Sequence, residues 1–171
     1  MQPSTTLTIS DDSGFLGIVN ADRYNSYVSE DWQLSQLFNH FIDEMNNDNL
    51  IIWSTGSEND WTVIFLPEPS EEKSFREFYK TIEVTAGEIF LTNYEDLSMA
   101  AQYADEKIPA KHNANLSIRL NNGRYRFQIR QLFDSEEPEY QSQGKINFEV
   151  IVQPDLVKTT HQVDKVFWWT Q

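Results

Sequence analysis

The clearest pattern in the chain lies at residues 116–130, which read LSIRL (116–120), NNG (121–123) and RYRFQIR (124–130). Apolar residues alternate with polar ones on both sides of Asn-Asn-Gly, and this period of two predicts β-strands with one buried and one solvated face. A tight turn between two such runs predicts a β-hairpin. Its solvated face would be cationic, because it carries Arg119, Arg124, Arg126 and Arg130.

Shorter apolar runs predict further strands, at residues 7–9, 15–19, 50–53, 61–66, 82–84, 88–91, 146–152 and 166–169. The first two runs flank Asp11-Asp12-Ser13-Gly14, which predicts a second hairpin. The runs at 50–53 and 61–66 are apolar at successive positions, so we expect central strands that are covered on both faces.

Two helices are expected between the strands. The longer spans residues 29–46, with Ser29 as N-cap, Glu30 and Asp31 in the first turn, and an apolar stripe behind them. The shorter begins after Asn93 and runs to Tyr103. The pattern predicts a single α+β domain over residues 1–171. It combines a mainly antiparallel sheet, in one or two packed layers, with one long and one short helix.

The charge is strongly uneven. The 171 residues hold 13 Lys and Arg against 27 Asp and Glu, a net charge of −14. Residues 1–72 carry thirteen of the acids and one base, Arg23. Such a segment is either a solvated surface or a surface that attracts a basic partner, and its field repels nucleic acid. We therefore expect no nucleic-acid partner, and we expect the arginines of residues 119–130 to pair across strands or with Glu136, Glu137 and Glu139.

Sequence motifs for catalysis or cofactors are missing. Cysteine is absent, His40, His112 and His161 have no metal-ligand spacing, and no phosphate-binding glycine loop occurs. We expect no cofactor, no metal and no membrane span, and we expect a cytoplasmic binding protein rather than an enzyme. An enzyme or small-ligand binder with a pocket lined by Trp53 and Trp61 stays open as an alternative.

Two sets of residues are candidates for contact with partners. The first is expected to bind a basic protein and comprises Trp32, Asp43, Glu44, Asp48, Glu58 and Asp60. Within it, Trp32 falls on the polar face of the longer helix, so it is either an aromatic anchor for the partner or a side chain covered by another part of the chain, and the position in the first turn favours covering. The second set is Trp168 and Trp169, which are adjacent on the expected last strand and therefore point to opposite faces. One of the two would then be free to support a homodimer, so a self-associating structural protein is a further alternative.

One stretch resembles a known group of proteins. Ile82-Glu83-Val84, Gly87-Glu88-Ile89-Phe90-Leu91, the run at 116–120 and the run at 122–127 give a strand, a glycine, a strand and an L-x-L–turn–G-x-Y unit. This order is similar to that of small bacterial proteins of the competence-J kind, which inhibit a DNA-entry nuclease, and of some immunity-type proteins. The resemblance implies a protein that neutralises a nuclease or toxin, and it assigns no inhibitory residue.

Overall fold

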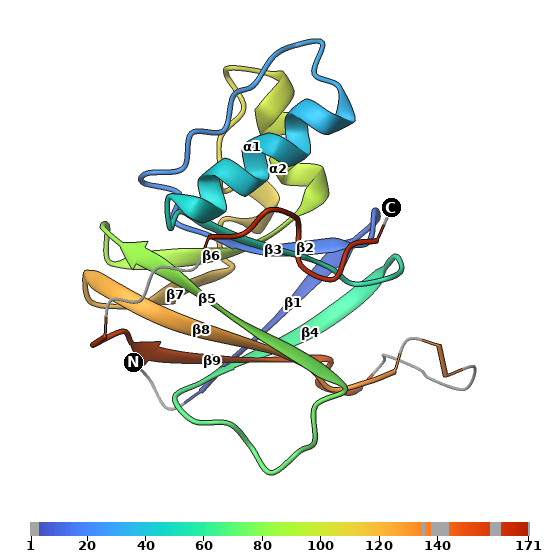
Figure 1. Ribbon diagram of the computed structural model, residues 1–171, viewed down its shortest axis with the longest axis vertical. Helices are drawn as coiled ribbons and strands as arrows, with labels where there is room; N and C mark the ends of the chain where they lie inside the picture. The colour runs from blue at the N-terminus through green and yellow to red at the C-terminus, as the bar shows by residue number, and fades with distance from the viewer. Residues whose placement is uncertain (1–3, 135, 138–143, 158–161, 171) are drawn as a thin grey trace.

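The computed structural model describes residues 4–134, 136–137, 144–157 and 162–170. Two stacked β-sheets form the body, and two helices cover the outer face of the smaller sheet (Figure 1). The larger sheet has the order β1 (Thr5–Asp11), β4 (Asn59–Leu66), β9 (Phe148–Pro154), β8 (Gly123–Gln131) and β5 (Arg76–Val84). The smaller has the order β3 (Leu50–Ser54), β2 (Phe15–Val19), β6 (Glu88–Asn93) and β7 (Ser117–Arg119). The expected α+β class is confirmed.

All neighbouring strands are antiparallel except β4 and β9, which are parallel. Both expected hairpins are wrong. Strand β1 pairs with β4, whereas β2 pairs with β3 and β6. Likewise β7 pairs with β6, whereas β8 pairs with β5 and β9. The turns at residues 12–14 and 120–122 carry the chain from one sheet to the other, so Arg119 is in a different sheet from Arg124, Arg126 and Arg130.

Three other strand expectations need correction. Strand β3 is buried along its first four residues, but it lies at the edge of its sheet. Strand β4 is internal, but its residues alternate between buried and partly exposed because only one face meets the other sheet. Residues 166–169 form no strand: Phe167 makes a single bridge to Trp53, and the chain then turns at Trp168, which has a φ of 65°.

The helices are α1 (Leu34–Asn46) and α2 (Tyr94–Gln102). The start of α2 is confirmed, since the Asn93 side chain accepts the Asp96 N–H as an N-cap. The start of α1 is five residues later than expected. The N–H groups of Val28 and Ser29 instead donate to the Ala101 carbonyl, which holds that segment along α2. A short 3₁₀ turn, Lys111–Asn113, follows α2.

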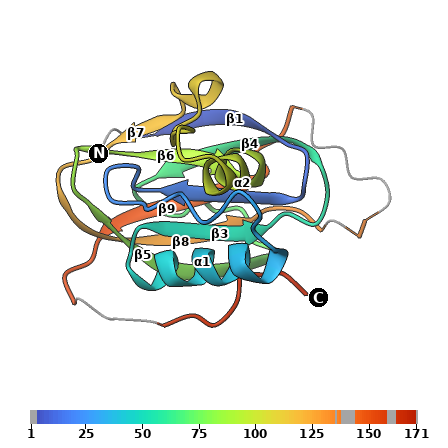
Figure 2. The same ribbon diagram turned by 90° about the horizontal axis from the view of Figure 1, so that it is seen from above.

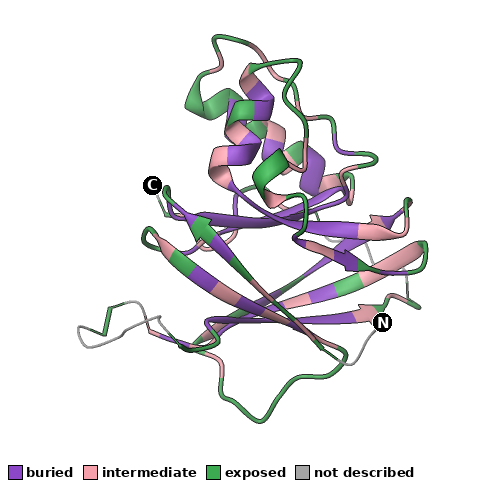
Figure 3. Cartoon of the chain, turned by 180° about the vertical axis from the view of Figure 1, so that it is seen from behind, coloured by how far each residue is buried: buried purple, intermediate pink, exposed green. Residues whose placement is uncertain are grey.

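Each face of the smaller sheet covers its own apolar core. The core between the sheets contains Trp53 and Trp61, which are 0% and 1% exposed and both contact Phe148. The two tryptophans named above as the lining of an alternative pocket are thus core residues between the sheets. The second core lies beneath the helices and includes Phe38 and Phe41 of α1. Figure 3 shows buried residues on the sheets and the inner sides of the helices, and exposed residues on the loops. In the part of the chain that the structure describes, no helix is long and apolar enough to cross a bilayer.

A buried carboxylate holds the chain where it first passes between the sheets. Asp11 is 1% exposed and accepts the N–H groups of Ser13, Gly14 and Phe15, which close the turn after β1. Its other oxygen accepts the Thr55 hydroxyl at 2.6 Å and the Trp61 indole N–H at 2.8 Å. Asp11 thereby ties the β1–β2 turn to the β3–β4 turn.

Replacing this carboxylate is expected to destabilise the fold strongly. Asp11→Ala leaves several buried donors without an acceptor, which costs about 3–5 kcal/mol. Thermal unfolding would show a fall in Tm of about 10 °C. The neighbouring Asp12→Ala is the matched control, because that side chain is exposed, and its Tm should stay within about 2 °C of the wild type. Equal Tm values for the two variants would contradict this role of Asp11.

Candidate docking site

The turns between elements gather at two opposite ends of the sandwich (Figure 1). One end contains the turn after β1, the turn between β3 and β4, and the start of α2. The other contains the turn after α1 and the end of β5, which Asp48 joins through its contacts with Lys80 and Thr81. These two ends hold most of the acidic residues that the sequence singled out.

The first end carries an acidic corner, which we define as Asp12, Glu58, Asp60 and Glu95. Antiparallel pairing places Ser10 opposite Asp60, and the Ser10 hydroxyl donates to Asp60 Oδ1 at 2.8 Å. The Asp12 N–H donates to Glu95 Oε1 at 2.8 Å, which brings the first turn of α2 to the same place. Asp12, Glu58 and Asp60 are exposed. Among the described residues, no Lys, Arg or His forms an ion pair with any of the four.

Glu95 is the partly buried member of the acidic corner. Burial raises the pKa of its carboxyl group, and the negative charges of Asp11 and Asp12 raise that pKa further. Hydrogen bonds from the Asp12 N–H and the Ser13 hydroxyl act in the opposite direction. Burial is the larger cause of this upward shift of the pKa, and the neighbouring carboxylates add to it, so the charged form of Glu95 is disfavoured here.

At the opposite end, Asp48 is neutralised. Its carboxylate pairs with the buried Lys80 at 3.3 Å and with Arg124, and it accepts the Thr81 hydroxyl at 2.9 Å. Burial lowers the pKa of Lys80, although Asp48 opposes that shift. Arg124 also pairs with Asp155 at 2.9 Å. Asp48 therefore acts within a structural ion network.

The other expected contact residues near α1 have different surroundings. Glu44 is 5% exposed, and its carboxylate accepts the Asn25 N–H at 2.6 Å. Asp43 is exposed on the outer side of α1. Trp32 precedes α1, and its ring packs partly buried against the core under the helices.

The six residues expected to contact a basic partner therefore do not lie together in the structure. Glu58 and Asp60 belong to the acidic corner, whereas Asp43, Glu44 and Asp48 lie near the end of α1, at the other end of β3. That strand has five residues and spans roughly 17 Å. The acids of the first part of the chain do not form a single patch around α1. Sequence reasoning missed Glu95, because only the contact between α2 and the end of β1 brings it to the corner.

The arginines expected to project together are used separately. Arg130 pairs with Glu149 and Glu77, which are its direct neighbours on β9 and β5, so the expected cross-strand pairing is confirmed for it. Arg126 lies over the Tyr79 ring, with its guanidinium carbon 4.9 Å from the ring centroid. The guanidinium groups of Arg126 and Arg130 thus contact an aromatic ring and carboxylates of the larger sheet. Of the expected downstream partners, Glu139 lies outside the described residues.

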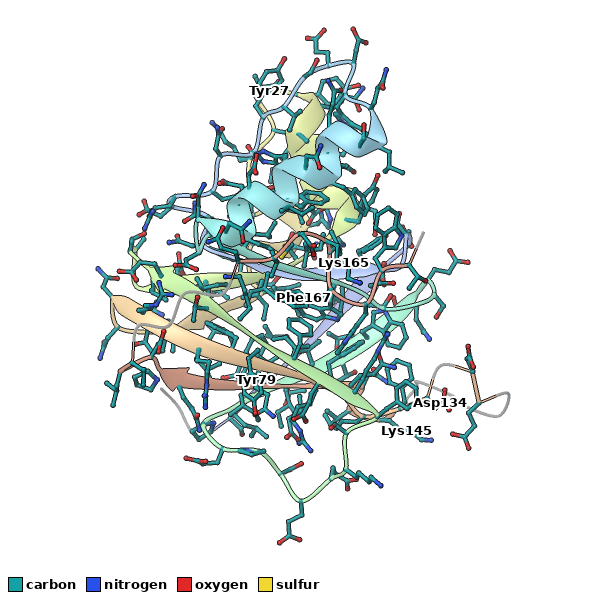
Figure 4. All side chains as sticks on the ribbon, viewed as in Figure 1. Tyr27, Tyr79, Asp134, Lys145, Lys165 and Phe167 are labelled. Carbon is teal, nitrogen blue, oxygen red and sulfur yellow. The ribbon has the colours of Figure 1, made fainter. Side chains whose placement is uncertain are left out.

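Trp168 and Trp169 pack against different cores: Trp168 against the core between the sheets, and Trp169 against the core beneath the helices. The Trp168 ring lies 4.9 Å from that of Phe78 and 4.1 Å from the Arg76 guanidinium carbon. The Trp169 ring lies 4.3 Å from that of Phe38. Both rings have neighbours within their own chain, so self-association through them stays a prediction. Figure 4 labels the adjacent Phe167, whose ring stacks on Phe78 at 3.8 Å.

A shallow cavity of about 320 Å³ lies between α1 and residues 164–169. Leu34, Phe38, Ile42 and Trp169 give it an apolar lining, and Asp164 and Lys165 supply charge. Within the described residues, no group of three or more His, Asp or Glu side chains is placed to hold a metal ion.

The raised pKa of Glu95 gives a prediction about pH. Since the folded chain holds this proton more tightly than the unfolded chain, the ionised carboxyl costs stability near neutral pH, and stability is regained as pH falls through the raised pKa. Glu95→Gln keeps the acceptor for the Asp12 N–H and should raise Tm by about 1–2 °C at pH 7. The gain should vanish below about pH 4, where Glu95 is protonated in both states.

Thermal unfolding across this pH range measures the effect. Glu71→Gln is the control, because Glu71 is an exposed loop residue, and its Tm should follow the wild type. A gain for Glu95→Gln that is the same at pH 4 and pH 7 would contradict the electrostatic explanation.

Comparison with known proteins shows the fold. No family model matches the chain, and no curated protein matches its sequence. A solved structure described as crocagin biosynthetic gene J is similar over 89% of this chain and 97% of its own, with a TM-score of 0.58 and 10% identity. ComJ from Bacillus subtilis, described as an inhibitor of the DNA-degrading activity of NucA, is similar over 86% of this chain and 92% of its own, with a TM-score of 0.47 and 14% identity. The first of these likenesses shows a shared fold.

Proposed function

We propose that this chain binds a basic protein and inhibits it, as an inhibitor or immunity protein acts on a nuclease or toxin. The observation that carries the proposal is the acidic corner. Its four carboxylates come from three separate elements, they have no basic partner among the described residues, and they stand on a rigid, buried support at Asp11.

Electrostatics supports a docking role for such a corner. Like charges held together destabilise a folded chain. Elsewhere this chain pairs Asp48, Asp155 and Glu149 with Lys80, Arg124 and Arg130. An unneutralised group of carboxylates attracts a cationic surface and raises the association rate by about 10–10³-fold. Nucleases that bind phosphate present cationic clefts, and the sequence resemblance to nuclease inhibitors makes this the partner class that we favour.

The proposal predicts that position, and not net charge alone, governs association. The triple variant Asp12→Asn, Glu58→Gln, Asp60→Asn removes the three exposed charges of the corner and leaves Glu95 in place. The amide oxygen that it introduces at position 60 can still accept the Ser10 hydroxyl. The matched control is Glu68→Gln, Glu71→Gln, Glu72→Gln, which neutralises three exposed acids of the loop between β4 and β5. Both variants change the net charge from −14 to −11.

The measurement begins with affinity capture at low salt and purification of the cationic protein that is retained. Stopped-flow association then compares the variants, with the partner's nuclease or toxin activity as a second readout. The corner variant should associate about tenfold more slowly at low salt, the loop variant should stay within about twofold of wild type, and the difference should shrink as salt screens the charges. Equal rates for the two variants, or a partner that is not basic, would sink the proposal.

A further inference from the structure

Strand β1 is an open edge of the larger sheet. In Figure 2 it runs along the margin of the molecule that is opposite to α1. The hydrogen bonds of the neighbouring strand β4 show which backbone groups of β1 are free. The Thr62 carbonyl accepts the Asn147 N–H, and the Thr62 N–H donates to the Asn147 side chain. The backbone N–H and carbonyl groups of the even-numbered residues of β4 therefore point toward β9. The odd-numbered residues of β4 therefore bond to β1.

The register then fixes the orientation of β1. Because Leu7 is opposite Val63 and Ile9 is opposite Trp61, the odd-numbered residues of β1 make the ladder with β4. The N–H and carbonyl groups of Thr6, Thr8 and Ser10 face the other way. The Asn93 side chain confirms this orientation, since it donates to the Ser10 carbonyl at 2.8 Å from outside the sheet.

This bond also marks where the open edge ends. Beyond Ser10, the next outward-facing group is the Asp12 N–H, which Glu95 accepts. On the N-terminal side of Ser10, the outward N–H and carbonyl groups of Thr6 and Thr8 have no partner among the described residues. Both threonines are exposed. The free edge therefore stops directly at the acidic corner.

The other three sheet edges are protected. Residues 166–169 cover β3, where the Ser54 N–H donates to the Phe167 carbonyl. Strand β5 carries Arg76, Glu77, Lys80 and Glu83, and β7 has only three residues. Charge, coverage and shortness are the usual devices that prevent strand addition. Residues 5–10 of β1 read TTLTIS, without charge, proline or glycine.

We propose that β1 receives an extended segment of the basic partner, which adds to the larger sheet beside Thr6 and Thr8 and places a Lys or Arg against the acidic corner. This inference rests on the proposed function. Backbone bonds to an exposed strand edge supply affinity, and a charged residue at one end fixes the position of the segment. Charge selects the occupant, since a second copy of the chain would add another −14.

Thr8→Pro tests the edge directly. The variant removes an outward N–H that has no partner among the described residues and places a ring on the free edge, a position where proline is tolerated. Thr8→Val is the matched control, because it keeps the N–H and the β-branched shape. Thermal unfolding of both variants verifies the fold.

The first probe is a synthetic peptide of two lysines followed by four Val-Thr pairs, tested alongside the same sequence reversed. In NMR titrations, one of the two should shift the amide signals of Thr6, Thr8 and Ser10. The same peptide N-methylated at alternate residues cannot form the ladder and should leave those signals unchanged. Thr8→Pro should weaken binding about tenfold or more, and Thr8→Val should bind as wild type.

Three results would overturn the inference. These are equal binding of the methylated peptide, unchanged binding by Thr8→Pro, and Thr6 and Thr8 signals that shift with protein concentration alone, which indicates a second copy. The captured partner separates this inference from the proposed function. If that partner is sensitive to the corner variant but binds Thr8→Pro normally, only strand addition fails. If no basic partner exists, the proposed function fails even where the peptide binds β1.

Discussion

The buried carboxylate of Asp11 is the constraint on which the other features depend. It accepts backbone and side-chain donors from both turns at one end of the sandwich, and it lies almost completely out of solvent. An ionised group in such a place is stable only when its hydrogen-bond partners are complete. Asp11 therefore holds the turn after β1 against the turn after β3 and supports the exposed acids around it. The open edge of β1 ends beside these acids, where Asn93 donates and Glu95 accepts a hydrogen bond.

Charge is handled differently at the two ends of the molecule. Near α1, Asp48 is joined to Lys80 and Arg124 in one network, and further along the larger sheet Arg130 connects Glu77 and Glu149. These pairs make the sheet more rigid and leave little field outside it. At the acidic corner, carboxylates stand together, and no base in the described part of the chain pairs with them. The contrast separates Asp48, which is paired within the fold, from Asp12, Glu58 and Asp60, which we propose face a partner, although all four lie within the first 72 residues.

Much of the secondary structure followed from the sequence, because it depends on local periods and caps. The alternation at 124–130 and the N-cap at Asn93 both mark real elements. The sheet assignment did not follow. Residues 12–14 and 121–123 look like hairpin turns, and a turn sequence specifies a reversal but not the sheet that the next strand joins. That choice depends on distant pairings such as β4 with β9. For the same reason the sequence grouped Glu58 with Asp60 but could not place Glu95 near them.

Hydrogen–deuterium exchange of the chain, free and bound to its purified basic partner, tests the central claim most directly. New protection is expected at residues 6–12 and 58–60, where the open edge of β1 meets the acidic corner. Exchange at the turn after α1 and in the loop between β4 and β5 should stay unchanged. Protection confined to α1 and its following turn, with none at the corner, would contradict the account.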